Sequence, residues 1–122
     1  MSILDSNTII YLSKEIISID DILEENQDIS ISVITYTEVL GYDFDSEKEE
    51  EFIRNFLNCF DIIYIDEIIV EIVIGLRKKY KIKLPDAIIC ASAILNKKTL
   101  ITNDTRLKKI DELTLKTIDS IK

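Results

Sequence analysis

Apolar residues occur in short blocks along this chain, and their spacing changes from block to block. Polar and apolar residues alternate over 28–33, which predicts a strand. Apolar residues three and four positions apart over 46–59 predict an amphipathic helix. The same reading of the whole chain predicts strands at 3–4, 28–33, 61–65, 99–102 and 115–118, and helices at 8–12, 16–25, 35–42, 46–59, 66–80 and 85–96.

Residues typical of helix ends support these helices. Asp66 is expected to cap the helix over 66–80, whose last turn carries the cations that the helix dipole favours. Pro85 fits the first position of the next helix, and Ser6 and Asn7 are expected to cap the first one. Strands that alternate with helices indicate parallel βαβ units and therefore an α/β fold.

The size and composition fit one domain over residues 1–122. A chain of 122 residues with 47% hydrophobic and 31% charged residues can bury its own core. No apolar run approaches the roughly 20 residues of a membrane span. Residues 1–5 lack the basic start of a signal peptide, so a cytoplasmic location without membrane contact is expected.

The chain contains no His, which excludes Ser-His-Asp catalysis, Cys-His catalysis and His-ligated zinc. Cys59 and Cys90 are too few for an all-cysteine zinc site, and both are predicted to be core thiols. The oxygen donors that remain suit Mg²⁺ or Mn²⁺. The net charge of −8 disfavours nonspecific binding to phosphate backbones and favours a basic protein partner, although bound divalent cations reverse the sign locally.

Four carboxylates occur where charge is costly. Asp5 and Asp104 follow predicted strands, and Glu38 and Asp86 are expected in the first turns of helices beside the same sheet edge. In parallel sheets, ligands bind beyond the carboxyl ends of the strands. A buried carboxylate is costly unless it is paired or binds a metal. We therefore predict one Mg²⁺ or Mn²⁺ site, suited to activating water against a phosphoryl group.

Each acid also has a purely structural explanation. Asp5 can accept hydrogen bonds from the following helix start, Asp86 can favour its helix dipole, and Asp104 can begin a turn. Glu38 is the most ambiguous, because residues 35–38 (Thr-Tyr-Thr-Glu) match a capping box. If no metal site exists, all four structural explanations must hold at the same sheet edge, and such a coincidence is less expected than a shared site.

The residues around these acids resemble the PIN-domain nucleases, most closely the VapC-like toxins of type II toxin–antitoxin modules. The resemblance covers nearly the whole chain. Residues 84–93 (Leu-Pro-Asp-Ala-Ile-Ile-Cys-Ala-Ser-Ala) are similar to the family's third-acid helix and form the most specific match. Residues 3–7, 35–39 and 102–104 are similar to the segments that carry the other three acids.

The resemblance implies an α/β/α sandwich around a mainly parallel sheet and an endoribonuclease that depends on Mg²⁺ or Mn²⁺. It implies Asp5, Glu38, Asp86 and Asp104 as metal-binding and catalytic residues, with Asn7 and Thr102 supporting them or contacting substrate. It also implies an RNA substrate, a homodimer and a cognate antitoxin. One departure is clear: where many of these toxins carry an Asp and then a Phe, this chain has Arg106 and Leu107.

A basic segment precedes the third acid, and its cations are candidates for binding RNA phosphates: Arg77, Lys78, Lys79, Lys81 and Lys83. A solvated helix end explains these cations equally well. Tyr36 and Tyr42 flank Glu38 and are candidates for stacking on bases, although tyrosines more often pack half-buried.

Other functions stay open. A non-catalytic PIN-fold domain that binds a basic partner would suit the charge of −8 and the presence of Arg106. A stand-alone PIN nuclease would use the same acids without an antitoxin. A phosphoacceptor domain of the response-regulator type is disfavoured, because such domains usually carry two adjacent acids after the first strand and this chain has Asp5 alone.

Overall fold

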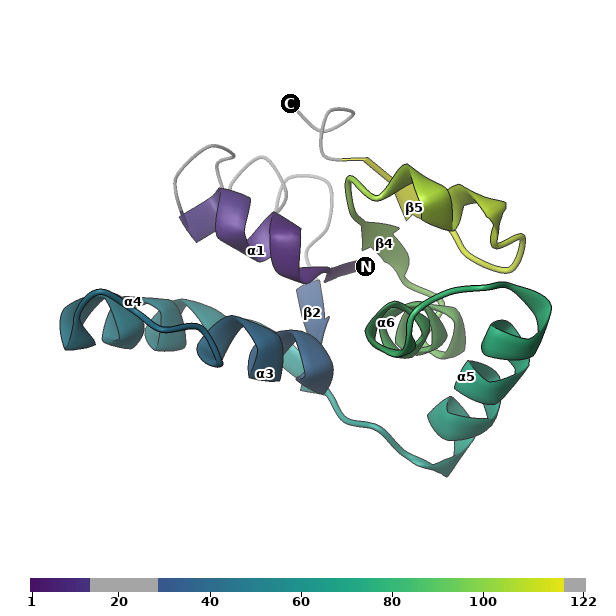
Figure 1. Ribbon diagram of the computed structural model, residues 1–122, viewed down its shortest axis with the longest axis horizontal. Coiled ribbons are helices and arrows are strands. Elements are labelled where there is room, and N and C mark those ends of the chain that lie inside the picture. Colours follow the sequence, from purple (N-terminus) through teal and green to yellow (C-terminus); the bar gives the residue numbers. More distant parts are fainter. Residues whose placement is uncertain (14–28, 118–122) are drawn as a thin grey trace.

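Five parallel strands form one sheet in the computed structural model, which describes residues 1–13 and 29–117 (Figure 1). Their order across the sheet is β3-β2-β1-β4-β5. The strands are β1 (Ser2–Leu4), β2 (Ile29–Ser32), β3 (Asp61–Ile63), β4 (Thr99–Ile101) and β5 (Leu115–Lys116). Every neighbouring pair is parallel, as the alternation of strands and helices predicted.

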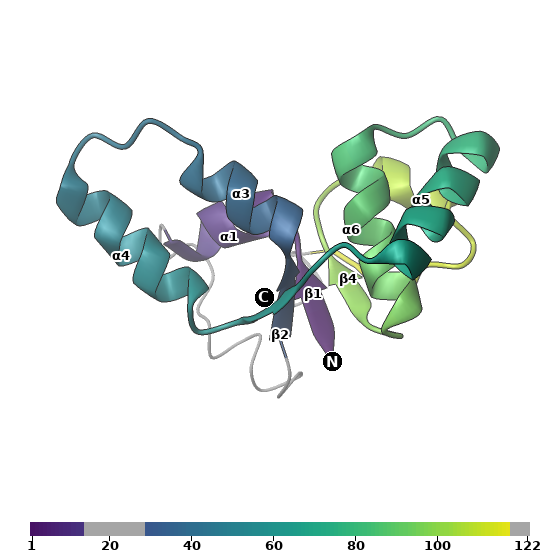
Figure 2. The same cartoon turned by 90° about the horizontal axis from the view of Figure 1, so that it is seen from below.

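Helices cover both faces of this sheet. They are α1 (Ser6–Ser13), α3 (Val33–Leu40), α4 (Glu47–Leu57), α5 (Glu67–Lys79) and α6 (Leu84–Leu95), followed by the 3₁₀ helix η1 (Thr105–Lys109). Figure 2 shows α1, α3 and α4 on one side of the strands and α5 and α6 on the other. The expected α/β/α sandwich is confirmed.

Neighbouring strand residues supply the two halves of the core. Ile3 packs in the cluster formed by α5 and α6, whereas Leu4 packs in the cluster formed by α1, α3 and α4. Leu100 and Ile101 of β4 divide in the same way. All four are fully buried, since successive side chains of a strand point to opposite faces and both faces are covered.

Two predicted helix starts are confirmed. The Asp66 side chain accepts a hydrogen bond from the Ile69 backbone N–H at 2.8 Å and caps α5. Ser46 accepts from the Glu49 backbone N–H at 3.1 Å and caps α4. Each capping residue directly precedes the first residue of its helix, so local sequence preference is enough to explain both helix starts.

Two other helix starts were predicted wrongly. α1 begins at Ser6, and the Asp5 carboxylate, rather than Ser6 or Asn7, accepts the hydrogen bond from the Thr8 backbone N–H. α3 begins at Val33 directly after β2, with Ser32 accepting from the Ile34 backbone N–H. The capping box over 35–38 therefore does not form. The predicted helix at 16–25 lies outside the described residues.

Burial at β2 and at the cysteines shows how the layers enclose the sheet. All four residues of β2 are buried, including the polar Ser30 and Ser32. Layers on both sides of the sheet enclose these serines, and Ser30 Oγ accepts a hydrogen bond from Lys98 Nζ at 2.9 Å. Cys90 is buried as predicted, but Cys59 follows α4 and is exposed.

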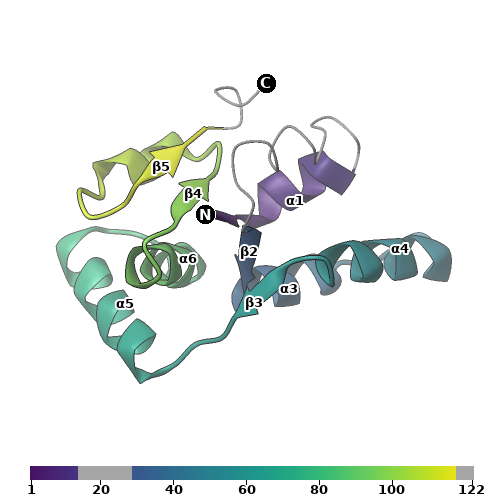
Figure 3. The same ribbon diagram turned by 180° about the vertical axis from the view of Figure 1, so that it is seen from behind.

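The connectivity creates a crevice beside β1. The chain proceeds from β1 outward to β2 and β3, and then crosses at 64–66 to the α5 and α6 side before β4 and β5 form on the other flank of β1 (Figure 3). Ligands of parallel sheets bind where the strand order reverses in this way. In the described ranges, 1–13 and 29–117, no helix is long and apolar enough to cross a membrane.

Candidate functional site

A polar hollow of about 220 Å³ opens at the reversal point, beyond the carboxyl ends of β1 and β4. All four predicted acids line it. Its lining residues are Asp5, Ser6, Asn7, Glu38, Tyr42, Asp86, Ile89 and Asp104. They come from the start of α1, the end of α3, the first turn of α6 and the link from β4 to η1.

Hydroxyl groups hold Asp5 from two sides. Its Oδ1 accepts from the Thr8 backbone N–H at 2.9 Å and lies 2.7 Å from Thr8 Oγ1. Its Oδ2 accepts a short hydrogen bond from Thr102 Oγ1, which itself accepts from the Asp104 backbone N–H at 3.0 Å. Thr8 and Thr102 are fully buried, so they fix the carboxylate direction and link the ends of β1 and β4.

Glu38 occupies the second half of α3 rather than its first turn. Because α3 begins at Val33, the prediction that Glu38 lies in the first turn of its helix is wrong, and the alternative explanation of Glu38 as part of a capping box fails as well. Ser6 Oγ donates a hydrogen bond to Glu38 Oε1 at 3.1 Å, across the hollow from α1 to α3. Glu38 is exposed, whereas Asp5, Asp86 and Asp104 are half-buried.

Asp86 occupies the first turn of α6 and is half-buried beside the other carboxylates of the hollow. Burial raises its pKa above the ordinary value, and the negative charge of Asp104 adds to this. Arg106 opposes the shift, while Asp5 and Glu38 add to it. The raised pKa means that the ionised carboxylate lacks sufficient compensating positive charge, which a bound cation would supply.

Asp104 has a cation of its own. Arg106 Nε donates to Asp104 Oδ1 at 2.9 Å, and Arg106 Nη2 donates to Oδ2 at 2.7 Å. The Arg106 side-chain hydrogen bonds lower the Asp104 pKa, against a smaller effect of burial. Arg106, where the chain departs from the family pattern, is therefore the residue that neutralises the fourth acid, Asp104.

The nearby thiol is unsuited to nucleophilic chemistry. Cys90 lies one helical turn after Asp86, and burial together with the negative charge of Asp86 raises its pKa to about 12. It therefore stays protonated at neutral pH, whereas reactive cysteines require a depressed pKa.

The oxygen donors of the hollow fit a hydrated hard cation. Among residues 1–13 and 29–117, no three acidic or thiol side chains stand close enough together to enclose an ion directly. Mg²⁺ keeps several waters and is commonly held by one or two carboxylates, so a directly enclosing cage is not required. Four carboxylates, one with a raised pKa, supply the charge for such an ion.

The other predicted site residues divide between the hollow and the surface away from it. Asn7 lines the hollow and is exposed. Arg77 and Lys78 line an apolar pocket instead, and Lys79 forms an ion pair with Glu112 at 2.9 Å. Lys81 and Lys83 line a shallow depression beside Arg77. Their role as phosphate contacts stays a prediction.

Sequence reasoning missed two hydroxyl supports of the site. Ser6 was assigned to helix capping, and Thr8 was treated as an ordinary helical residue. The three-residue spacing from Asp5 to Thr8 is a capping signal that identifies Thr8. No local signal connects Ser6 to Glu38, because these residues meet only when α1 packs against α3.

The family model of the PIN domain matches residues 2–113. A toxin–antitoxin complex from Klebsiella pneumoniae is similar at 32% identity and a TM-score of 0.74, covering 93% of this chain and 96% of that chain. A search of curated proteins found no significant match.

Two further solved structures share the fold at lower identity. VapBC2 from Rickettsia felis, bound to a promoter DNA fragment, is 23% identical with a TM-score of 0.82 and covers 95% of this chain and 97% of that chain. DNA-bound VapBC from Salmonella typhimurium is 19% identical with a TM-score of 0.84 and covers 96% and 98%. The chain therefore belongs to the PIN-domain family and, within it, resembles the VapC-like toxins of toxin–antitoxin modules.

Proposed function

We propose that this chain is a Mg²⁺- or Mn²⁺-dependent endoribonuclease and the toxin of a type II toxin–antitoxin pair. The observation that carries the proposal is the convergence of Asp5, Glu38, Asp86 and Asp104 on one polar hollow. Those four residues come from segments far apart in the sequence, so local helix and turn signals do not account for their meeting. The similarity to a Klebsiella toxin–antitoxin complex supports the biological role.

In the proposed mechanism, Asp5, Asp86 and Asp104 would hold the divalent ion. The ion, when bound, polarises the scissile phosphate and lowers the pKa of a water molecule. Thr8 and Thr102 keep Asp5 in a fixed direction, which limits the reorganisation needed when the ion enters.

Glu38 is assigned the proton-accepting role. It is the most exposed of the four acids, and Ser6 orients its carboxylate through Oε1. A solvent-facing carboxylate at the rim can accept the proton of the attacking water and release it to solvent. Cys90 takes no part, because its raised pKa keeps it protonated.

Tyr42 is the proposed contact for an RNA base. It lines the hollow and 61% of its surface is exposed, so its ring is free to stack on an unpaired base. Tyr36 is less suited, because its hydroxyl accepts a hydrogen bond from Arg54 at 3.3 Å and the ring is half-buried.

The proposed partners are a cognate antitoxin and a second copy of the chain. A net charge of −8 suits an antitoxin segment that carries basic and apolar residues. A small reading frame beside the gene for this chain, encoding a DNA-binding part and such a segment, would support the toxin role. Its absence would favour a stand-alone nuclease.

Cleavage of RNA by the purified chain tests the proposal. Cleavage should require Mg²⁺ or Mn²⁺, and Asp5→Asn and Asp86→Asn should abolish it while circular dichroism stays unchanged. Asp45→Asn is the matched control, since Asp45 is an exposed acid outside the hollow. Cleavage that persists in either hollow variant at the rate of the control would refute the assignment.

A non-catalytic interaction domain is the second candidate. The observation in its favour is the ion pair of Asp104 with Arg106, which already neutralises one proposed ligand. Calorimetry with Mn²⁺ separates the two candidates. Absence of binding at millimolar Mn²⁺, together with absence of cleavage, favours the second.

A further inference from the structure

Arg106 is a solvent-facing cation beside the acidic hollow. Its side chain is 73% exposed, whereas that of Asp104, which lines the hollow, is 20% exposed. The positive charge of Arg106 also acts on Asp86, in the first turn of α6. In a chain with a net charge of −8, a cation in this place is open to an anion that arrives from solvent.

Asp104 occupies the guanidinium donors that such an anion would use. Arg106 Nε and Nη2 donate to the two carboxylate oxygens at 2.9 and 2.7 Å. A phosphate group also presents two oxygens to the edge of a guanidinium, so carboxylate and phosphate are alternative partners in one geometry. The ion pair therefore holds Arg106 in a form that suits phosphate but is blocked.

The guanidinium can leave this pair at small cost. Its side chain is largely exposed, and an ion pair with so exposed a partner contributes little net stability, because both groups regain water when it opens. The Asp104 carboxylate also accepts from the Arg106 backbone N–H at 3.1 Å, at the start of η1. This bond does not involve the guanidinium, so the turn can persist when the guanidinium leaves.

Neutralisation of Asp104 removes the reason for the pair. A carboxylate that directs its oxygens to a divalent ion has less charge left for the guanidinium, and the two positive charges repel each other. Asparagine at position 104 has the same consequence without an ion, since its amide is uncharged and has one acceptor oxygen. In both cases Arg106 becomes available to another anion.

We infer that Arg106 is a substrate-binding residue that exchanges the Asp104 carboxylate for an RNA phosphate when Asp104 is neutralised. The choice of RNA rests on the proposed function, whereas the exchange itself requires neither cleavage nor a metal. The two binding events are coupled. Whatever neutralises Asp104 strengthens phosphate binding, and phosphate on Arg106 strengthens cation binding at Asp104 by the same factor.

RNA binding in chelator tests the exchange, because the proposed cleavage has no metal there. The probe is a labelled single-stranded RNA of ten nucleotides, and fluorescence anisotropy gives its dissociation constant. Asp86→Asn is the matched control, since it removes an equal charge from the hollow and leaves the Arg106 pair intact. Asp104→Asn should bind the RNA at least about threefold more tightly than Asp86→Asn, because it also frees a guanidinium.

The dependence on salt distinguishes a new phosphate contact from a general loss of negative charge. Each contact to single-stranded nucleic acid steepens the slope of log affinity against log salt by about 0.7. We expect Asp104→Asn to show one such increment over Asp86→Asn. A purely structural role of Arg106 would leave this slope unchanged.

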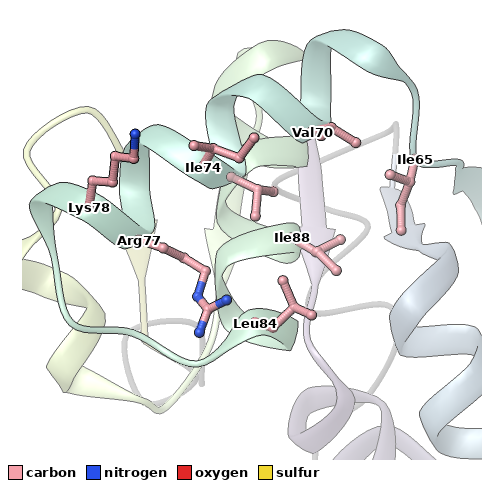
Figure 4. A pocket seen from close by; sticks show the side chains of 8 residues that line it. Ile65, Val70, Ile74, Arg77, Lys78, Leu84 and Ile88 are labelled. Carbon is pink, nitrogen blue, oxygen red and sulfur yellow. The ribbon is translucent and has the colours of Figure 1, made fainter.

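A second arginine shows whether the gain belongs to Arg106. The gain from Asp104→Asn should vanish in an Arg106→Ala background and persist in an Arg77→Ala background. Arg77 lines the apolar pocket between α5 and the start of α6, where Figure 4 shows it, and is not among the residues that line the hollow. Circular dichroism checks that all variants fold.

Equal RNA affinities of Asp104→Asn and Asp86→Asn, or a gain that survives Arg106→Ala, would overturn the inference. Absence of RNA binding by Asp104→Asn would overturn it as well. Cleavage by the wild-type chain in Mn²⁺ is measured separately. A wild type that cleaves RNA, combined with no gain that depends on Arg106, refutes the exchange alone. A gain that depends on Arg106, combined with no cleavage, refutes the nuclease proposal alone.

Discussion

Arg106 holds Asp104 through two hydrogen bonds, Nε to Oδ1 at 2.9 Å and Nη2 to Oδ2 at 2.7 Å. This forked geometry is the strongest pairing available to a carboxylate and a guanidinium. It joins Arg106, the residue that departs from the family pattern, to Asp104, one of the proposed metal ligands. The internal cation and an entering divalent ion therefore compete for the same carboxylate.

Removal of this competitor should strengthen metal binding. We expect Arg106→Ala to bind Mn²⁺ a few-fold more tightly than the wild type, because Asp104 is no longer neutralised from within the chain. Calorimetry measures the change, and Lys108→Ala is a control that removes a nearby exposed cation. Equal or weaker Mn²⁺ binding by Arg106→Ala would show that Asp104 does not contribute to the ion site.

Asp86 should destabilise the metal-free chain as pH rises. Its pKa is raised in the folded state, chiefly by burial, so folding favours the protonated carboxyl. The favourable contribution is complete below the ordinary carboxyl pKa and is lost as pH rises through the folded-state value. We expect Asp86→Asn to melt at a higher temperature than the wild type at pH 7 in chelator.

The pH dependence provides the control for that expectation. The two melting temperatures should approach each other near pH 3, where Asp86 is protonated in the folded and unfolded chains alike. A higher melting temperature for the wild type than for Asp86→Asn at pH 7 without metal would contradict the expectation. It would mean that hydrogen bonding or an unrecognised cation compensates the Asp86 charge.

Thr102 should matter through its hydroxyl group. It is fully buried and connects the Asp5 carboxylate to the Asp104 backbone N–H. Thr102→Val keeps the shape but leaves both partners unsatisfied, which we expect to cost about 1–3 kcal/mol of folding free energy. Thr102→Ser retains the hydroxyl, so its denaturant midpoint should stay close to the wild-type value, and its Mn²⁺ affinity should exceed that of Thr102→Val.

The local parts of the fold could be predicted from sequence, because their causes are local. Asp66 caps α5 as predicted, and α4 begins next to Ser46, where the amphipathic pattern predicted a helix start. The burial of Ser30 could not be predicted in this way, because polar–apolar alternation does not reveal that helices cover both faces of the sheet. Parallel sheets bury their strands on both sides, and only the assembled layers show this.

The sequence predicted which acids line the candidate site, but it did not predict how their side chains are arranged. Carboxylates after β1 and β4 follow from parallel topology, and Asp5 and Asp104 meet the same hollow. Glu38 was misplaced within its helix, because the Thr35–Glu38 spacing imitates a capping box that competes with the stronger start at Ser32. The Arg106 fork depends on a side-chain conformation that sequence spacing does not specify.

Gly75 offers a gain in stability unconnected with the site. It lies inside α5, and a Cβ atom added there meets no other atom within 4 Å. Glycine inside a helix is less favourable than alanine by about 0.5–1 kcal/mol, so Gly75→Ala should stabilise the chain by that amount. Denaturant unfolding measures this gain in the free energy of unfolding.

Gly41→Ala is the contrasting variant, because its Cβ would lie 3.0 Å from the Thr37 carbonyl oxygen and should bring no such gain. An unfolding free energy of Gly75→Ala equal to or below that of the wild type would contradict this expectation, because it would mean that α5 does not keep a regular, open helical surface at position 75.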